Sequence, residues 1–241
     1  MKSAKVALVF GGSRGIGAAI AQRLARDGHD VAFTWVSRED SARAQVAAVE
    51  QAGSRALAIH ADSADPVAVK AAVEETMRVF GRLDVAVVNA GVLRLGTIDG
   101  YRLEDLDQTL AVNVRGVFLA IQAAVARMGE GGRVITIGSN TAVRTGHKGS
   151  SVYAMSKAAV AAMVQNLALD LAPWRIAINN VQPGPTQTDM TAAMADEIRK
   201  SIPLDRLAQP SEIASLVAWL AGAESGFMTG SSLTIDGGFV L

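Results

Sequence analysis

The hydrophobic pattern of this 241-residue chain predicts an α/β fold: a doubly wound parallel sheet of about seven strands with helices on both faces. Short apolar runs recur along the chain, and most contain no polar residue, which is typical of strands covered on both sides. Between them lie longer Ala-rich stretches whose apolar residues are three and four positions apart, as on one face of a helix. This repeated strand–helix alternation implies parallel strands. A closed TIM barrel alternates in the same way and is the alternative architecture.

Each element has its own sequence signal. The expected strands are the apolar runs Lys5–Phe10, Val31–Val36, Ala56–His60, Asp84–Asn89, Arg133–Gly138, Ile176–Gln182 and Ser232–Asp236. The expected helices are Ile16–Arg26, Ser41–Gln51, Pro66–Phe80, Leu103–Met128, Val152–Leu171 and Ser211–Leu220. Pro66 and Pro210 stand in first turns, where proline is favoured. Gly28, Gly53 and Gly81 follow three of the helices, where a left-handed cap favours glycine.

The stretch 189–207 breaks the alternation, because it is long, contains Pro203 and has no clear strand. Insertions of this kind are usually lids or substrate loops. No linker, low-complexity tract or short repeat interrupts the rest of the chain. We therefore expect a single domain over residues 1–241, with 189–207 as its substrate lid.

Composition excludes several classes of protein. The 23 basic and 23 acidic residues cancel, and 50% of residues are hydrophobic, which excludes disorder and argues against nucleic-acid or anionic-membrane partners. Cysteine is absent, so the chain has no disulfide or thiolate metal site, which suits a reducing cytoplasm. The apolar runs are too short for a signal peptide or a spanning helix, and the three histidines lack metal-ligand spacing. We expect a cytoplasmic protein without metal.

A glycine-rich turn follows the first expected strand. Glycines permit a tight turn and close backbone approach to a ligand, and the following helix presents free N–H groups to an anion. An ordinary strand–helix turn would explain a lone glycine cluster equally well. As a nucleotide site, the turn would contribute Gly11, Ser13, Arg14, Gly15, Ile16 and Gly17.

Residues after the second strand favour NADPH over NADH. An NAD site usually places an acidic residue about 20 positions after the glycines, to hold the ribose 2′-hydroxyl. Here no acid precedes Glu39, whereas Arg14, Ser37 and Arg38 are donors that suit a 2′-phosphate. Either arginine alone would ordinarily be a solvated surface charge.

Other polar residues also follow strand ends, where open α/β sheets bind ligands. Asp62 and Ser63 follow the third expected strand, and Asn89–Ala90–Gly91 follows the fourth. We interpret these five residues as cofactor-binding. Asp62 could equally be a helix cap.

A possible acid–base group lies in the second half of the chain. Ser139 ends an expected strand, and Tyr153 and Lys157 are four residues apart and so share one helix face. A phenol has a pKa of about 10, which a nearby ammonium and an oxidised nicotinamide would lower. Such a tyrosine could exchange a proton with a carbonyl oxygen held by Ser139. By itself, a tyrosine–lysine pair at this spacing is more often a surface feature.

Together these motifs resemble the short-chain dehydrogenase/reductase family over essentially the whole chain. The resemblance is carried, in order, by Gly11–Gly17, Asn89–Ala90–Gly91, Asn113, Ser139, Tyr153-x-x-x-Lys157, Pro183–Gly184 and Thr234–Ile235–Asp236–Gly237–Gly238. It implies a Rossmann fold, a homotetramer, NADP(H) as cofactor and hydride transfer between nicotinamide and a ketone or secondary alcohol.

The resemblance also implies residue roles. Tyr153 would be the proton donor in reduction and the base in oxidation. Lys157 would hold the nicotinamide ribose and lower the Tyr153 pKa, and Ser139 would polarise the substrate carbonyl. Asn113 would anchor a water leading from Lys157 to solvent. The nicotinamide end would contact Pro183, Gly184, Thr186 and Thr188.

Two positions depart from the family pattern. Phe10 replaces the usual threonine and Val88 the usual first asparagine, so we expect altered packing near the cofactor turn. A closer likeness is to a bacterial subgroup that includes a cyclic-di-GMP-binding protein. A nucleotide-binding regulator is therefore one alternative function, and a 3-oxoacyl-carrier-protein reductase is another, although Arg127 and Arg133 do not make a basic patch. His147, Met190 and Met194 are guesses for the substrate cleft.

Overall fold

The computed structural model describes residues 4–144 and 147–241. In these residues seven parallel strands form one open sheet in the order β3-β2-β1-β4-β5-β6-β7. The strands are β1 (Val6–Phe10), β2 (Asp30–Trp35), β3 (Ala56–His60), β4 (Val85–Val88), β5 (Arg133–Ile137), β6 (Ala177–Pro183) and β7 (Ser232–Ile235). The predicted doubly wound sheet is confirmed, and the barrel alternative is wrong, because β3 and β7 are open edges.

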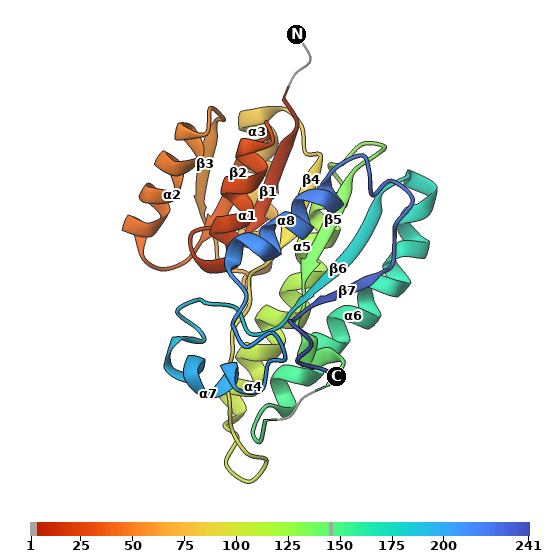
Figure 1. Ribbon diagram of the computed structural model, residues 1–241. Coiled ribbons are helices and arrows are strands. Elements are labelled where there is room, and N and C mark those ends of the chain that lie inside the picture. The colour runs from red at the N-terminus through yellow and green to blue at the C-terminus, as the bar shows by residue number, and fades with distance from the viewer. Residues whose placement is uncertain (1–3, 145–146) are drawn as a thin grey trace.

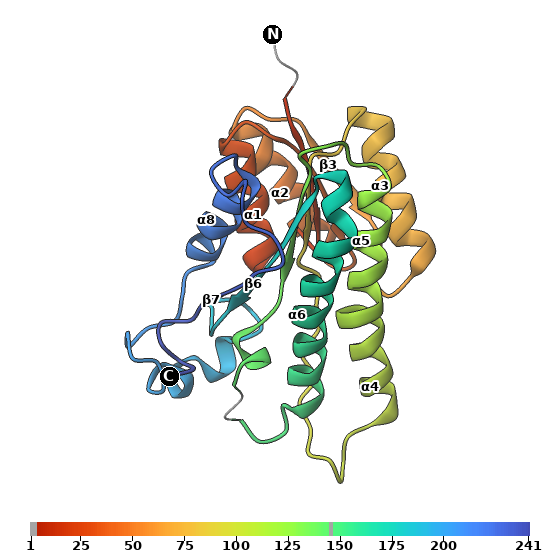
Figure 2. The ribbon, with the colours of Figure 1, turned by 90° about the vertical axis from the view of Figure 1, so that its right-hand side faces the viewer.

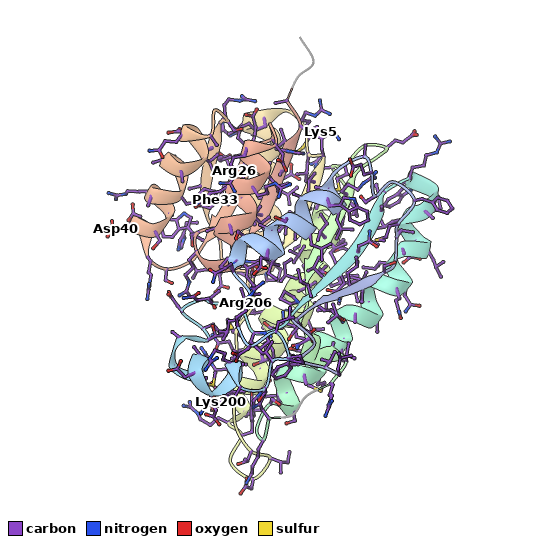
Figure 3. The ribbon with its side chains drawn as sticks, viewed as in Figure 1. Lys5, Arg26, Phe33, Asp40, Lys200 and Arg206 are labelled. Atoms are coloured by element: carbon purple, nitrogen blue, oxygen red, sulfur yellow. The ribbon has the colours of Figure 1, made fainter. Side chains whose placement is uncertain are left out.

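Helices cover both faces of the sheet (Figures 1 and 2). One face carries α1 (Gly15–Arg26), α2 (Glu39–Gln51) and α8 (Pro210–Ala221). The other carries α3 (Pro66–Phe80), α5 (Val117–Val125) and α6 (Ser151–Leu171). Each face has its own buried apolar cluster. Phe33, labelled in Figure 3, belongs to the cluster under α1 and is completely buried, which stabilises the fold by roughly 1.5–3 kcal/mol.

The long helix predicted over Leu103–Met128 is interrupted. It consists of α4 (Leu103–Leu110), a π-helical segment (Ala111–Gly116) and α5, which ends at Val125. Apolar spacing alone does not reveal such an interruption. A π-helical turn widens the backbone locally and is frequent at functional sites.

The sheet has its topological switch point between β1 and β4. Successive connections run in opposite directions from these two strands, which opens a crevice at their carboxyl ends. Phe10 and Val88, the two departures from the family pattern, are paired in register here and are both buried. An apolar contact therefore stands where the family has polar groups. The Thr34 hydroxyl accepts a hydrogen bond from the Gly11 N–H at 2.9 Å and holds the glycine turn from the side of β2.

The segment 189–207 lies beyond the carboxyl ends of the strands (Figure 1). It contains a 3-10 turn (Ala192–Met194) and the short helix α7 (Ala195–Arg199), neither of which the sequence predicts. Its far end is tied to α8, where the Arg206 guanidinium lies 2.7 Å from the Glu212 carboxylate and lowers the pKa of that carboxyl to about 2. Figure 3 shows Arg206 between α8 and α7.

Two helical stretches, Leu103–Val125 and Ser151–Trp174, are long and apolar enough to cross a membrane by length and composition alone. Both contribute buried side chains to the cluster beneath α3, α5 and α6, as core helices do. Shorter 3-10 turns occur at Asn140–Ala142 and Ala172–Trp174.

Candidate active site

A cavity of about 660 Å³ opens at the switch point. Its volume is within the range of ligand pockets, roughly 300–1,000 Å³. Twelve of the predicted cofactor residues line it: Gly11, Ser13, Arg14, Gly15, Ile16, Ser37, Asp62, Ser63, Asn89, Ala90, Gly91 and Thr188. The remaining predicted cofactor residues are not in its wall: Gly17, Arg38, Tyr153, Lys157, Pro183, Gly184 and Thr186.

The other half of the cavity wall comes from residues that the sequence analysis did not predict to bind the cofactor, although it assigned Met190 to the substrate cleft. These are Thr34, Trp35, Val36, Ala61, Ala64, Val92, Leu93, Arg94, Gln108, Val112, Asp189 and Met190. Five of them, Ala61, Ala64, Val92, Leu93 and Arg94, come within five residues of a predicted strand end, so a wider window after each strand would have found these five. Trp35 forms a firm wall, because its ring packs edge-on against His60 with centroids 4.7 Å apart.

The glycine turn approaches the end of β4 closely. Gly11 has a φ of +74°, and a Cβ there would lie 2.9 Å from the Ala90 Cα. A Cβ on Gly17 would lie 2.1 Å from the Gly11 oxygen and 2.5 Å from the Asn89 amide. That amide donates to the Gly11 oxygen at 2.7 Å. Gly17 therefore serves this packing and does not face the cavity.

The first turn of α1 is suited to an anion. Arg14 occupies its N-cap without a side-chain cap hydrogen bond, and no acidic residue lies in the first turn. Backbone N–H groups at such a helix start attract phosphate through hydrogen bonding and the helix dipole.

Arg14 and Arg38 come together at the mouth of the cavity, and an acidic residue lies between them. Asp189 Oδ2 is 3.4 Å from Arg14 Nη1 and 3.3 Å from Arg38 Nη1. Arg38 has the left-handed φ of +62°, an uncommon conformation for a residue other than glycine. The sequence analysis predicted both arginines but not the aspartate, which follows β6 and is 151 residues from Arg38.

The helix-cap alternative for Asp62 is wrong. Asp65 caps α3, since its side chain accepts from the Val67 N–H at 2.8 Å. Asp62 accepts from the Ala64 N–H at 2.8 Å and closes the turn that leads from β3 into the cavity wall.

Ser139, Tyr153 and Lys157 form one cluster beside the cavity. Ser139 follows β5, and its hydroxyl is close enough to Tyr153 to act on the pKa of that phenol. Lys157 is 4% exposed, with Nζ 5.7 Å from the centre of the Tyr153 ring and donating to the Ile137 oxygen at 3.0 Å. A Cβ on Gly91, which lines the cavity, would lie 3.5 Å from Lys157 Nζ. The cluster thus borders the cavity across Gly91.

Burial controls the protonation of the cluster. It raises the pKa of Tyr153, and the Ser139 hydroxyl offsets only part of that effect. Burial also lowers the pKa of Lys157 to about 8. The lysine by itself therefore does not lower the Tyr153 pKa as expected. Of the two charges invoked above, the oxidised nicotinamide would have to provide that effect.

Asn113 lies in the π-helical segment and is completely buried. Its amide nitrogen donates to the Val92 oxygen and its amide oxygen accepts from the Val92 N–H, both at 2.9 Å. The amide nitrogen also donates to Ser156 Oγ at 3.2 Å. The side chain thus fixes the chain that leaves β4, and its water-anchoring role stays a prediction.

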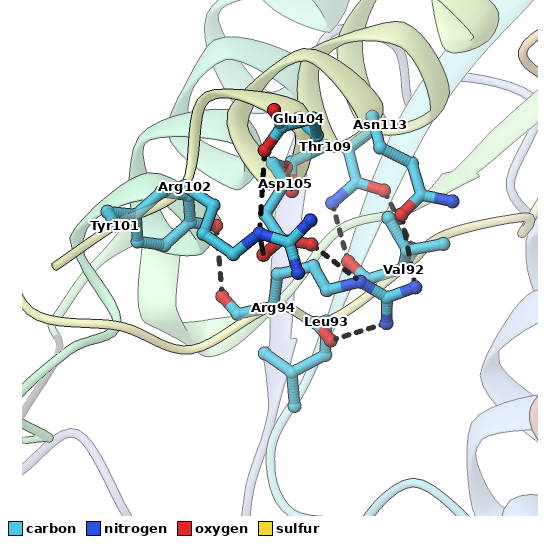
Figure 4. A network of polar contacts seen from close by, with 10 residues as sticks. Val92, Leu93, Arg94, Tyr101, Arg102, Glu104, Asp105, Thr109 and Asn113 are labelled. Atoms are coloured by element: carbon cyan, nitrogen blue, oxygen red, sulfur yellow. Dashed lines mark hydrogen bonds and ion pairs between the residues drawn. The ribbon is translucent and has the colours of Figure 1, made fainter.

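The loop after Val92 is held by the network in Figure 4. Arg94 donates to Gln108 Oε1 at 3.0 Å and lies 3.5 Å from the Asp105 carboxylate. Tyr101 Oη donates to the Arg94 oxygen at 3.2 Å. These contacts attach the loop to α4 and place Arg94 in the cavity wall.

The chain after β6 crosses the glycine turn. Thr186 is buried and donates to the Gly184 oxygen at 3.0 Å. The Thr188 methyl lies 3.4 Å from where a Cβ on Gly15 would be, so Thr188 closes the cavity opposite that glycine. Pro183 is the last residue of β6.

The residues guessed for the substrate cleft are dispersed. Met190 lines the cavity, whereas Met194 does not. The His147 ring stacks on Phe239 with centroids 6.0 Å apart. In the part of the chain that the structure describes, no group of three His, Asp or Glu residues could hold a metal ion.

Known proteins resemble this chain over nearly its whole length. The family model described as "Enoyl-(Acyl carrier protein) reductase" matches residues 11–240. The cyclic-di-GMP-binding biofilm dispersal mediator protein of Escherichia coli is 41% identical over 238 residues, covering 98% of this chain and 97% of that protein. A 3-oxoacyl-[acyl-carrier-protein] reductase of Staphylococcus aureus is 36% identical over 247 residues, covering 100% of both.

A solved structure is also similar. The short chain dehydrogenase from Burkholderia cenocepacia in complex with NADP has a TM-score of 0.96 and 50% identity, with 98% of each chain covered. The fold, the ordered motifs and these matches agree over the length of the chain. The chain therefore belongs to the short-chain dehydrogenase/reductase family.

Proposed function

We propose that this protein is an NADPH-dependent carbonyl reductase, which in reverse oxidises a secondary alcohol. The observation that carries the proposal is the Ser139–Tyr153–Lys157 cluster at the border of the cavity, across Gly91. A proton donor for a carbonyl oxygen and a candidate cofactor cavity thus lie next to each other. The family is one of oxidoreductases that use nicotinamide cofactors.

The cavity residues fit a dinucleotide with a 2′-phosphate. The tight turn at Gly11 and Gly17 keeps side chains away from the backbone, and the uncapped start of α1 offers N–H groups to the pyrophosphate. Arg14, Arg38 and Ser37 supply donors for the 2′-phosphate. Asp62, Ser63, Asn89, Ala90 and Gly91 would border the adenosine half. The complex of the Burkholderia cenocepacia protein with NADP supports this assignment.

NADPH, when bound, supplies the hydride for the carbonyl carbon. In reduction, Tyr153 donates its phenolic proton to the carbonyl oxygen, and Ser139 hydrogen-bonds the same oxygen. Tyr153 is protonated at neutral pH, as a proton donor must be, although the burial that raises its pKa also makes the free phenol a weaker acid. Lys157 is charged below a pH of about 8, and the positive charge of the oxidised nicotinamide would add to it in stabilising the phenolate that remains, because the lysine alone does not offset the effect of burial. In oxidation the same phenolate is the base.

Several supporting roles belong to the same proposal. Lys157 would also hold the nicotinamide ribose, and Asn113 would anchor the water that returns the proton. The nicotinamide end would contact Pro183, Gly184, Thr186 and Thr188, and the segment 189–207 would cover the substrate as a lid.

A ketone of low molecular weight is the proposed substrate class. A carrier-protein substrate needs a basic surface near the site, and Arg127 and Arg133 do not provide one. Arg127 follows α5 and Arg133 begins β5, at the amino-terminal end of the strands and so at the end opposite the cavity. Arg127 is also paired with Glu74 at 2.7 Å. A carrier-protein substrate is the alternative, because the similar Staphylococcus aureus protein is a 3-oxoacyl-[acyl-carrier-protein] reductase.

A nucleotide-binding regulator is the second alternative, and the Escherichia coli relative favours it. The two arginines of the cavity mouth would serve a cyclic dinucleotide as well as NADPH. Such a regulator has no use for the Ser139–Tyr153–Lys157 cluster, so turnover separates the two functions.

A homotetramer is part of the proposal. Phe118 on α5, with Met155 and Leu169 on α6, are exposed apolar side chains. A second copy of the chain that packs on this side of the sheet would cover these side chains. Measuring the mass of the protein in solution by light scattering tests the tetramer. The cytoplasmic location expected from the sequence stays a prediction.

Tyr153→Phe tests the proposed function. Oxidation of NADPH, followed by absorbance with a panel of aryl ketones, diketones and a β-ketoester, should fall about 10²–10⁴-fold, because the proton donor is lost. NADPH binding should remain close to that of the wild type. Ser215→Ala is the control, since it removes a hydroxyl from α8, which contributes no residue to the cavity wall. Undiminished turnover in the Tyr153→Phe protein would remove Tyr153 from its role.

A wild-type protein that binds NADPH but reduces no ketone of the panel would leave the regulator as the better assignment. Titration with cyclic-di-GMP would then follow, with the NADPH-saturated protein as the competition control.

A further inference from the structure

Asp189 occupies the place between the two arginines that are the proposed 2′-phosphate ligands. Its Oδ2 atom lies 3.4 Å from Arg14 Nη1 and 3.3 Å from Arg38 Nη1, so one carboxylate oxygen bridges both guanidinium groups. The three side chains come from the glycine turn, the end of β2 and the segment after β6. They are 56–64% exposed and meet at the cavity mouth, where a ligand can reach them.

The position of Asp189 is fixed by the backbone that carries it. Thr191 donates to the Thr186 oxygen and accepts from the Thr188 N–H at 3.2 Å, which closes the turn around Asp189. Thr186 also pairs with Ala208 in an isolated β-bridge. Asp189 thus projects from an anchored turn, and its contact with the arginines is built into the fold.

This carboxylate changes the charge that a 2′-phosphate meets. Arg14 and Arg38 together carry two positive charges, and Asp189 removes one of them. A phosphate dianion that binds the same guanidinium groups must displace the carboxylate or approach it, and either costs binding free energy. A ribose 2′-hydroxyl carries no charge and encounters no such repulsion. Asp189 therefore weakens the binding of NADP(H), which carries the 2′-phosphate, and leaves the binding of NAD(H) unaffected.

We propose that Asp189 is a specificity-determining residue that competes with the 2′-phosphate for Arg14 and Arg38 and so weakens the preference for NADP(H) over NAD(H). This inference rests on the proposed function, in which the two arginines bind that phosphate. When no phosphate is present, Asp189 holds both guanidinium groups at the cavity mouth.

Asp189→Asn tests the competition, because it removes the charge and keeps the shape. Each exposed ion pair contributes about 0.2–1 kcal/mol, so loss of both should tighten NADPH binding about two- to thirtyfold and leave NADH binding unchanged. Dissociation constants measured by calorimetry at low ionic strength avoid screening of these exposed charges. Adenosine 2′,5′-bisphosphate and AMP differ only in the 2′-phosphate, and the first should follow NADPH and the second NADH.

Asp205→Asn is the matched control. Asp205 lies in the same segment and is paired with Arg199 at 2.6 Å, so the variant removes an equal charge away from the cavity. Equal effects of the two variants would overturn the proposal, as would an Asp189→Asn protein with unchanged NADPH affinity. Weakened NADH binding with unchanged NADPH binding would show instead that Asp189 accepts the ribose hydroxyl.

The proposed function and the competition between Asp189 and the 2′-phosphate can be refuted separately. A wild-type protein that binds NADPH through its arginines, but does not respond to Asp189→Asn, refutes the competition and keeps the proposed function. A wild-type protein that binds none of the four nucleotides refutes the proposed function and the competition with it.

Discussion

Replacing Lys157 with methionine should change how the stability of the protein depends on pH. Lys157 is 4% exposed, and burial lowers its pKa from 10.5 to about 8. Between these values the unfolded chain binds more protons than the folded one, so stability rises with pH. One pKa unit corresponds to 1.36 kcal/mol. The buried ammonium therefore costs about 3 kcal/mol at pH 7 and about 2 kcal/mol at pH 9.

Urea unfolding of the wild type and the Lys157→Met protein at both pH values tests this reasoning. The free energy of unfolding of the variant, relative to the wild type, should fall by about 1 kcal/mol from pH 7 to pH 9. The hydrogen bond to the Ile137 oxygen is lost at both pH values and cancels. Lys70→Met, at an exposed site on α3, should leave the pH dependence unchanged. Equal protein concentrations are needed, because association shifts apparent stability. Identical pH dependence in wild type and Lys157→Met would refute the reasoning.

Two further substitutions test the cofactor site. Arg14→Ala combined with Arg38→Ala should weaken NADPH binding at least about tenfold and NADH binding less than about twofold, measured by calorimetry, because charge-assisted bonds to the 2′-phosphate are lost. Arg43→Ala, another exposed arginine near the start of α2, is the control, and equal loss for both cofactors would contradict the assignment. Gly17→Ala should weaken both cofactors and destabilise the fold by about 1–3 kcal/mol in urea unfolding, since its Cβ would lie 2.1 Å from a backbone oxygen. Gly129→Ala, where a Cβ meets open space, should change neither quantity.

The sheet could be predicted from the sequence because each strand has a local signal. A run such as Val85–Val88 is apolar throughout, which identifies a strand covered on both faces without knowledge of its neighbours. The grouping of Ser139, Tyr153 and Lys157 was also predictable, since the last two share a helix face and the first ends a strand. The spacing could not predict that the Tyr153 pKa is raised, because desolvation depends on the packing of distant segments around the phenol.

Features that depend on how distant segments cross were not predictable. The bridge from Asp189 to Arg14 joins residues 175 positions apart, and no local pattern marks the aspartate as a partner. The π-helical segment around Asn113 has the same origin, since its side chain bonds to the backbone of Val92. Phe10 and Val88, the two departures from the family pattern, are 78 positions apart in the sequence, and only the register of β1 and β4 shows that they are neighbours.

The buried lysine bears on the choice between an enzyme and a nucleotide-binding regulator. Binding a nucleotide at the cavity mouth needs the glycine turn and the two arginines, and none of these requires a buried charge. Lys157 carries a stability cost that an apolar residue would avoid, and buried charges are retained chiefly where they serve a function. Its ammonium lies 5.7 Å from the Tyr153 ring and borders the cavity across Gly91, where no contact with either arginine is found among the described residues. The residue that weakens the fold is thus one that a nicotinamide-dependent enzyme would use and that a cyclic-dinucleotide site at the cavity mouth would not.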